Sequence, residues 1–265
     1  GVQTCALPIS RLEAFQGTIT RADFQKLLDT VYAPGGAAAG MIEVRDDEAV
    51  ILKTLTPPSE FTLRFAKDAA SAKAPPRNWR SFSSLPRAKP VRPLDGVKIA
   101  LDPGHVGGEW ALMEGRSFHR GEDKPVREGE ITLLVASLAA PKLRALGAEV
   151  SLVRDANTPA SRFTVDALRP AARKELLAQG VASPRENYDG ERDPQKGGTV
   201  QWQAERLFYR VAEIQERARR VREKLRPDLT VCIHFNGTDW GDPDNPVFSE
   251  KEELHVMVSG CFSAE

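Results

Sequence analysis

The first periodic stretch of apolar residues along the chain predicts a short amphipathic helix at Arg21–Tyr32. Its apolar side chains follow the spacing i, i+3, i+4 and i+7, which places them on one helical face: Phe24, Leu27, Leu28 and Val31. Thr20 stands immediately before this stretch, where a hydroxyl side chain commonly caps a helix N-terminus. The pattern therefore predicts a helix that begins after Thr20 and buries one face.

Short strand-like runs follow this helix. Their apolar and β-branched residues lie in Met41–Val44, Ala49–Lys53 and Phe61–Phe65, with a turn expected at Asp46–Asp47. We expect residues 1–68 to form a small α+β region. About the first ten of these are expected to be non-native, because they lack an initiating Met, a basic segment and a long apolar run.

The next segment changes in character. Residues 69–96 hold five prolines and four serines and show no apolar periodicity. This composition is typical of an extended linker. We therefore expect a domain boundary between the small α+β region and residues 97–265.

From residue 97 onward, strand-like and helix-like runs alternate. In chain order they predict a strand at Val97–Leu101, a helix at Ile131–Leu146, a strand at Glu149–Val153, a long helix at Gln201–Arg226 and a strand at Leu229–Phe235. Pro141 is expected to kink or split the first helix, because its ring removes a hydrogen-bond donor. The basic run Arg217–Arg222 is expected to be a solvated face of the long helix. The alternation predicts an α/β domain with a mostly parallel central sheet flanked by helices.

Composition and charge narrow the classes of function. The chain of 265 residues is 41% hydrophobic and 28% charged, as is usual for soluble globular proteins. Lys plus Arg and Asp plus Glu number 37 each, so no net field would hold the chain on nucleic acid or on an anionic membrane. No apolar run reaches the roughly 18 residues of a transmembrane segment. We expect no nucleic-acid partner, and any substrate must be recognised by a local site.

Two histidines follow predicted strands. His105 comes after Val97–Leu101, and His234 lies at the end of Leu229–Phe235. The carboxyl ends of parallel strands meet at one edge of a sheet, where ligands bind. Glu128 stands just before a predicted helix, whose N-terminus lies at that same edge. Two imidazoles and one carboxylate suit a metal ion, so these three residues are candidate metal ligands.

Other interpretations of the acidic residues and histidines are open at this point. Glu130 lies two residues after Glu128 and is an alternative ligand, and either carboxylate could instead complement the helix dipole. His119 and His255 belong to no such arrangement, and we expect them to be structural or surface residues.

Two further features have competing explanations. Cys232 shares a strand face with His234, which suggests a thiol–imidazole pair, but a buried strand thiol is usually inert packing. The glycine-rich turn at Gly104–Gly108 fits neither of the common nucleotide-binding loops. We therefore favour the metal site over nucleophilic or nucleotide chemistry.

Five segments in order carry a resemblance to a known family. They are Ile99-Ala-Leu-Asp-Pro-Gly-His-Val-Gly-Gly108, Glu128-Gly-Glu-Ile-Thr-Leu133, Leu146-Gly-Ala-Glu-Val-Ser-Leu-Val-Arg-Asp155, Glu216-Arg217 and Asp228-Leu-Thr-Val-Cys-Ile-His-Phe-Asn236. Together they resemble the zinc-dependent N-acetylmuramoyl-L-alanine amidases of the amidase 3 type, over about residues 96–236. The resemblance implies an α/β fold with a twisted central sheet, and zinc ligands at His105, Glu128 and His234.

The resemblance also implies a function in the bacterial cell wall. Zinc held by two imidazoles and a carboxylate keeps one position open, polarises a scissile carbonyl and lowers the pKa of coordinated water to about 7. We expect hydrolysis of the amide between N-acetylmuramic acid and L-alanine in peptidoglycan, in the periplasm or outside the cell, although no export signal is visible. Asn236, in the segment that carries the last ligand, is the candidate substrate-binding residue.

The chain departs from the family pattern in ways that leave alternatives. The family's proton-transfer Glu lies on a later strand, but no segment after His234 matches it, so the catalytic base is unassigned. We expect residues 97–265 to lack the C-terminal part of the domain and to hydrolyse peptidoglycan poorly. Residues 156–200 form an insertion expected to cap or line the cleft. The alternatives are a catalytically deficient amidase-like module that binds zinc or cell wall, and a zinc amidohydrolase with a different amide substrate.

Overall fold

The computed structural model describes residues 12–55, 58–76, 80–119, 122–235, 250 and 253–257. It divides into two compact units. One consists of Gly1–Arg77 together with Lys251–Glu265, and the other of Asn78–Glu250. No helix in the described part of the chain is long and apolar enough to cross a membrane.

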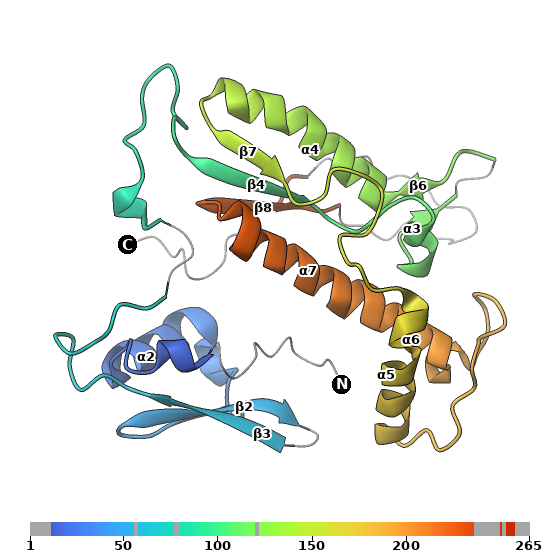
Figure 1. The fold of residues 1–265 in the computed structure, drawn as a ribbon, viewed down its shortest axis with the longest axis horizontal. Coiled ribbons are helices and arrows are strands. Elements are labelled where there is room, and N and C mark those ends of the chain that lie inside the picture. The colour runs from blue at the N-terminus through green and yellow to red at the C-terminus, as the bar shows by residue number, and fades with distance from the viewer. Residues whose placement is uncertain are drawn as a thin grey trace. The chain divides into compact units, whose positions relative to one another are not determined.

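The first unit combines a helix and an antiparallel sheet, in the elements that the sequence predicts (Figure 1). α2 (Arg21–Leu27) begins after Thr20, whose side chain accepts a hydrogen bond from the Asp23 backbone N–H, and it continues into a π-helical turn at Leu28–Tyr32. Three strands in the order β1-β2-β3 form the sheet: β1 (Ile42–Val44), β2 (Glu48–Leu55) and β3 (Pro58–Arg64). The helix and β1 share a small apolar core.

The second unit is built on a three-stranded parallel sheet. Its strands are β4 (Lys98–Pro103), β7 (Glu149–Leu152) and β8 (Leu229–Ile233), in the spatial order β7-β4-β8. Ile99 of the central strand lies opposite Val150 on one side and Leu229 on the other. The chain thus has mixed helices and sheets with a small parallel sheet, which is consistent with the predicted α/β class.

One face of the parallel sheet is covered by α4 (Glu128–Ala145) (Figure 1). Buried apolar residues of β4, of this helix and of the turn between the helix and β7 form the core: Ile99, Leu101, Ala136, Ala140 and Ala148. Pro141 lies inside the helix, which is continuous, so the expectation that it would split the helix is wrong. Pro141 and Ser137 are both exposed, so the Ser137 carbonyl that loses its intrahelical donor is free to bond water.

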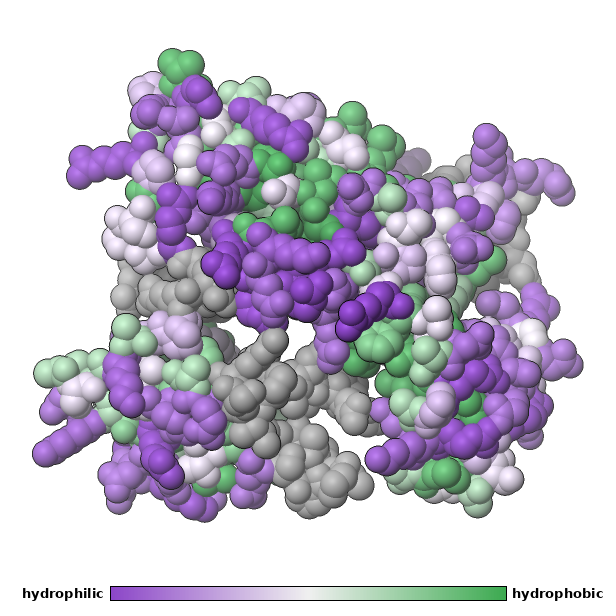
Figure 2. Space-filling view, in the orientation of Figure 1, coloured by the Kyte–Doolittle hydropathy of each residue, from purple (hydrophilic) through white to green (hydrophobic). Residues whose placement is uncertain are grey.

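A long helical stretch lies on the other side of the sheet (Figure 1). It consists of α6 (Val200–Leu207), a π-helical turn at Phe208–Ala212, α7 (Glu213–Arg219) and a second π-helical turn at Arg220–Leu225. This agrees with the helix predicted from the amphipathic pattern. The space-filling view shows a hydrophilic surface over α7, where Arg219 pairs with Glu216 and Glu223 (Figure 2).

The predicted insertion contributes a second helix to this side of the unit. α5 (Val165–Ala178) packs against α6 through an apolar cluster: Ala172, Leu176, Val200 and Ala204. Within residues 156–200, all of which are described, no segment joins the parallel sheet, as expected for an insertion. Its expected role in lining a cleft stays a prediction.

The connection from β4 to α4, residues 104–127, contains two small elements. α3 (Trp110–Met113) follows the loop after β4, and a two-stranded antiparallel pair of β5 (Ser117–Phe118) and β6 (Val126–Arg127) leads into α4. The end of this connection brings Glu128 close to His105, which follows β4.

The strand order places a topological switch point at one position in the sheet. The chain moves from β4 through α4 to β7 on one side, and then returns past β4 to β8 on the other side. Where successive connections of a parallel sheet run in opposite directions, the loops separate and leave a ligand-binding crevice beyond the carboxyl ends of the strands. In this chain that point lies between β4 and β8.

Candidate metal centre

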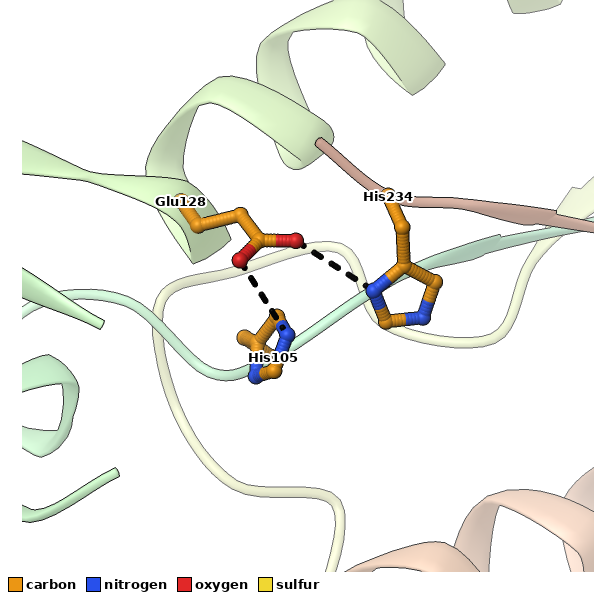
Figure 3. A group of neighbouring side chains, drawn as sticks. All are labelled: His105, Glu128 and His234. Carbon is orange, nitrogen blue, oxygen red and sulfur yellow. Dashed lines mark hydrogen bonds and ion pairs between the residues drawn. The ribbon is translucent and has the colours of Figure 1, made fainter. Parts of the chain in front are cut away.

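Three side chains meet at this switch point, beyond the carboxyl ends of β4 and β8 (Figure 3). His105 follows β4, Glu128 is the first residue of α4, and His234 follows β8. The Nε2 atom of His105 lies 3.3 Å from Oε2 of Glu128, and the Nδ1 atom of His234 lies 3.3 Å from Oε1 of the same carboxylate. One potential ligand atom from each residue falls within 4.8 Å of the other two. The structure thus brings together all three of the sequence-predicted ligands.

The backbone at His105 is held in an uncommon conformation. Its φ of 56° lies in the left-handed region, which non-glycine residues adopt rarely. The Arg217 guanidinium on α7 donates to the His105 carbonyl at 2.5 Å and to the Pro103 carbonyl at 2.7 Å. Such strain persists only where surrounding contacts determine the conformation. Here the contacts aim the imidazole toward Glu128.

Glu128 is held at the N-terminus of α4 by a backbone hydrogen bond and an ion pair. The Phe235 backbone N–H donates to Oε1 at 3.0 Å, and the Arg116 guanidinium lies 3.7 Å from Oε2. Only 11% of the Glu128 side chain is exposed. The alternative ligand Glu130 points elsewhere, since its Oε1 accepts from the Gly108 N–H and from Arg127, each at 3.1 Å. The geometry therefore favours Glu128 over Glu130.

Two glycines allow the elements of the site to approach closely. A Cβ atom on Gly104 would lie 2.4 Å from the His234 ring, and one on Gly129 would lie 2.2 Å from the Gly107 nitrogen. These separations are shorter than real Cβ contacts. The glycines in the matched segments are therefore needed to pack His234 against β4 and the helix start against the loop.

Two buried arginines donate hydrogen bonds to backbone carbonyls in and around the loop after β4. Arg154 donates to the Gly129 carbonyl at 2.8 Å, and Arg217 pairs with Glu213 at 2.8 Å as well as with Asp102 at 3.1 Å. Burial is the main reason why the pKa of Arg154 falls to about 10, so it remains charged at neutral pH. Arg217 belongs to the basic run expected to be a solvated face, but only 7% of it is exposed, so that expectation is wrong.

Burial also acts on the carboxyl group of Asp102. It raises the pKa of Asp102, whereas the Arg217 guanidinium opposes that rise. Glu213 extends the same network, because its carboxylate accepts from the backbone N–H groups of Ala160 and Ser161 at the start of the insertion. The buried charges therefore connect α7, the insertion and the loop that carries His105.

A further carboxylate beside the site was missed by the sequence analysis. Oε2 of Glu114 lies 3.0 Å from Nδ1 of His105, on the side of the ring away from Glu128, and only 3% of its side chain is exposed. Glu114 directly follows α3 and belongs to no recognisable motif. Its nine-residue separation from His105 was the available signal, and that spacing is not specific.

The remaining predicted residues lie apart from the metal centre. His119 and His255 are exposed, and His255 pairs with Glu253, in agreement with the surface interpretation. Asn236 lies outside the described residues. Cys232 is exposed on β8, so the expectation of a buried thiol is wrong, but partial burial still raises its pKa and thereby disfavours the thiolate.

The donor set fits a zinc ion. Two ligand atoms bound tetrahedrally at about 2.0–2.1 Å lie roughly 3.3 Å apart. Each imidazole lies 3.3 Å from a different oxygen of Glu128, and one ligand atom from each residue lies within 4.8 Å of the other two. The three side chains are therefore close to a zinc-binding arrangement and need only a small inward movement to reach it. The residue types are those of catalytic zinc sites, in which three protein ligands leave a further position for water or substrate. Half of the His234 side chain is exposed, at 51%, so the site opens to solvent on that side.

Comparisons with known proteins add no relative. No family model, no curated protein sequence and no solved structure matches this chain.

Proposed function

We propose that this chain is a zinc-dependent amidohydrolase that cleaves the amide between N-acetylmuramic acid and L-alanine in peptidoglycan. The observation that carries the proposal is the convergence of His105, Glu128 and His234 at the switch point between β4 and β8. The five ordered segments that resemble amidase 3 enzymes supply the substrate class. The same resemblance suggests a twisted central sheet and a location in the periplasm or outside the cell.

The protein's own groups would prepare the site for amide hydrolysis. When bound, zinc supplies a Lewis acid for the scissile carbonyl and for water. Glu128 is held by the Phe235 N–H, so its carboxylate stays directed toward both imidazoles. The Arg116 guanidinium is half exposed beside Glu128, where it can bind an anionic group of the stem peptide. Asn236 is the proposed substrate contact from the segment after β8.

The first test is metal content. Purified protein should hold one zinc, and the alanine variants of His105, Glu128 and His234 should each lose stoichiometric zinc. Glu130→Ala is the matched control, because it removes a carboxylate two residues away from Glu128 that bonds the Gly108 loop instead. Retained zinc in His234→Ala would overturn the ligand set. Loss in Glu130→Ala but not in Glu128→Ala would reassign the carboxylate ligand.

The second test is activity. Zinc-loaded protein is incubated with purified sacculi, and released stem peptides with a free L-alanine amino group are measured. Release that disappears in the three ligand variants supports the proposed function. Stoichiometric zinc without any release would reject it as an activity of this chain.

A binding module that holds zinc or cell wall without turnover is the second candidate. Among the described residues, the carboxylates beside the two histidines are Glu128, which serves as a ligand, and Glu114, which is buried against His105. Neither is placed to exchange a proton with bulk water, whereas hydrolysis needs such a group. Zinc binding with sacculus binding but no peptide release would favour this candidate. Release from a different amide would favour the alternative hydrolase.

A further inference from the structure

The carboxylate of Glu114 has an environment that its position in the sequence does not explain. It is buried in a segment that is otherwise partly exposed, and the partner seen for it is the Nδ1 atom of His105 at 3.0 Å. Burying a carboxylate is costly unless a charge or a hydrogen bond compensates it. The pairing with His105 supplies that compensation.

The contact between Glu114 and His105 determines which ring nitrogen of His105 faces Glu128. A carboxylate at Nδ1 holds a proton on that nitrogen, which leaves Nε2 with the lone pair. Nε2 is the atom that lies 3.3 Å from Glu128. Zinc-binding histidines commonly donate their second N–H to a carboxylate, which fixes the tautomer and raises the basicity of the ligand.

Two other contacts restrict the same residue. The His105 backbone is held in the left-handed region, and its carbonyl accepts from Arg217 at 2.5 Å. Arg217 therefore fixes the main chain, while Glu114 fixes the rotation of the ring. Together they leave the imidazole with one orientation, in which Nε2 points at Glu128.

We propose that Glu114 is a positioning residue that selects Nε2 of His105 as the metal-binding atom and thereby sets the zinc affinity of the site. This inference rests on the zinc site of the proposed function, but it does not depend on which amide is cleaved. It assigns to Glu114 an effect on the metal and no direct contact with substrate.

The experiment measures zinc affinity in the full chain. Metal-free wild type, Glu114→Ala and Glu114→Gln are titrated with zinc against a chromophoric chelator at one pH. Glu114→Ala should bind zinc about 10–100-fold more weakly than the wild type. Glu114→Gln should lose less, because its amide oxygen still accepts from Nδ1–H but carries no charge. It also keeps the volume of the side chain, so it tests the proposal even where the alanine variant folds poorly.

Glu109→Gln is the matched control. Glu109 lies five residues earlier in the same connection and is exposed, so the same chemical change there should leave the zinc affinity unaltered. The free energy of unfolding of each metal-free variant is measured in parallel. A purely structural role for Glu114 would lower that free energy while leaving the zinc affinity of the folded protein unchanged.

A spectroscopic measurement reports the tautomer directly. Long-range ¹H–¹⁵N correlation spectra of the zinc-loaded wild type should show His105 protonated on Nδ1. Equal zinc affinities of the wild type and both Glu114 variants, or a proton on Nε2, would overturn the proposal. Zinc binding that depends on Glu114, without peptide release from sacculi, would support it while rejecting the amidase function. A wild type that binds no zinc would overturn both.

Discussion

The loop after β4 and the helix pair α5–α6 lie in the same unit but are held by different forces. The loop is fixed by charged side chains in the interior, because Arg154 and Arg217 donate to its carbonyls and to carbonyls around it. The helix pair is held by an apolar cluster in which Ala172 and Ala204 allow close packing. Hydrogen bonds and ion pairs fix the direction of the groups they join, whereas an apolar cluster stabilises mainly by burying apolar surface. This explains why a metal ligand, His105, projects from the loop and none projects from the helix pair.

The largest expected effect comes from removing the charged support of the loop. Arg217→Ala leaves Glu213 buried without its main partner and two loop carbonyls without a donor. Truncating one partner of a buried ion pair costs about 3–5 kcal/mol, and we expect this loss in urea unfolding of the metal-free protein. Arg219→Ala is the control, because Arg219 is exposed, and its loss should be below about 1 kcal/mol. Equal losses for the two variants would contradict the role of Arg217.

The next effect tests the helix pair. Leu176→Ala removes a side chain that is 1% exposed from the apolar cluster, which should cost about 2–4 kcal/mol in unfolding free energy. Because this cluster supplies no direction to the metal ligands, the zinc affinity of the folded variant should match that of the wild type. A large loss of zinc affinity would show that the two regions are coupled more tightly than their separate packing suggests.

A smaller effect is expected from a substitution at Gly104, directly after β4. Gly104→Ala places a Cβ atom 2.4 Å from the His234 ring and forces the ring away from Glu128. We expect zinc to bind at least about 100-fold more weakly, which corresponds to roughly 2.7 kcal/mol. Gly198→Ala, in the insertion, is the control, since nothing lies within 4 Å of its added Cβ. Unchanged zinc affinity in Gly104→Ala would show that His234 does not need this close approach.

The smallest effect concerns the opposite end of the sheet. Arg80 donates two hydrogen bonds to Asp228 just before β8, and this contact lowers the pKa of the Asp228 carboxyl. The stability from a lowered pKa is present above the unfolded value of about 3.9 and is lost as the pH falls through the folded value. Asp228→Asn should therefore cost about 1–2 kcal/mol at pH 7, and this difference should shrink as the pH falls below about 3.9. Urea unfolding across this range checks it, and a difference that persists in acid would contradict the ion pair as its cause.

The elements of the fold were predictable because each leaves a local pattern. Thr20 caps α2 as expected, and the strand-like and helix-like runs after residue 97 became β4, α4, β7 and β8. The three metal-site residues were also predictable, because the topology of a parallel sheet brings strand ends and helix starts to one edge. Pro141 misled the prediction, because its exposed position lets water replace the missing bond.

The supporting residues of the site could not be predicted from local pattern. Arg217 belongs to a basic run, which by itself predicts an exposed side chain. It is buried because it donates to carbonyls that lie 112 and 114 residues earlier in the chain. Glu114 gives no periodic signal either, because α3 is short and ends directly before it. In both cases the partner is chosen by tertiary structure, which neither spacing nor composition records.

The origin of the ligands at distant points in the chain has a consequence for folding kinetics. Glu128 and His234 are 106 residues apart, and their meeting requires β8 to pair with β4 across an intervening chain that includes the insertion. Contacts of such long sequence separation form late, because the entropy of closing the intervening chain must be overcome first. Capture of an ion by all three side chains therefore follows the pairing of β8 rather than the formation of any helix. The rate of ion uptake during refolding therefore reports the rate at which the parallel sheet is completed.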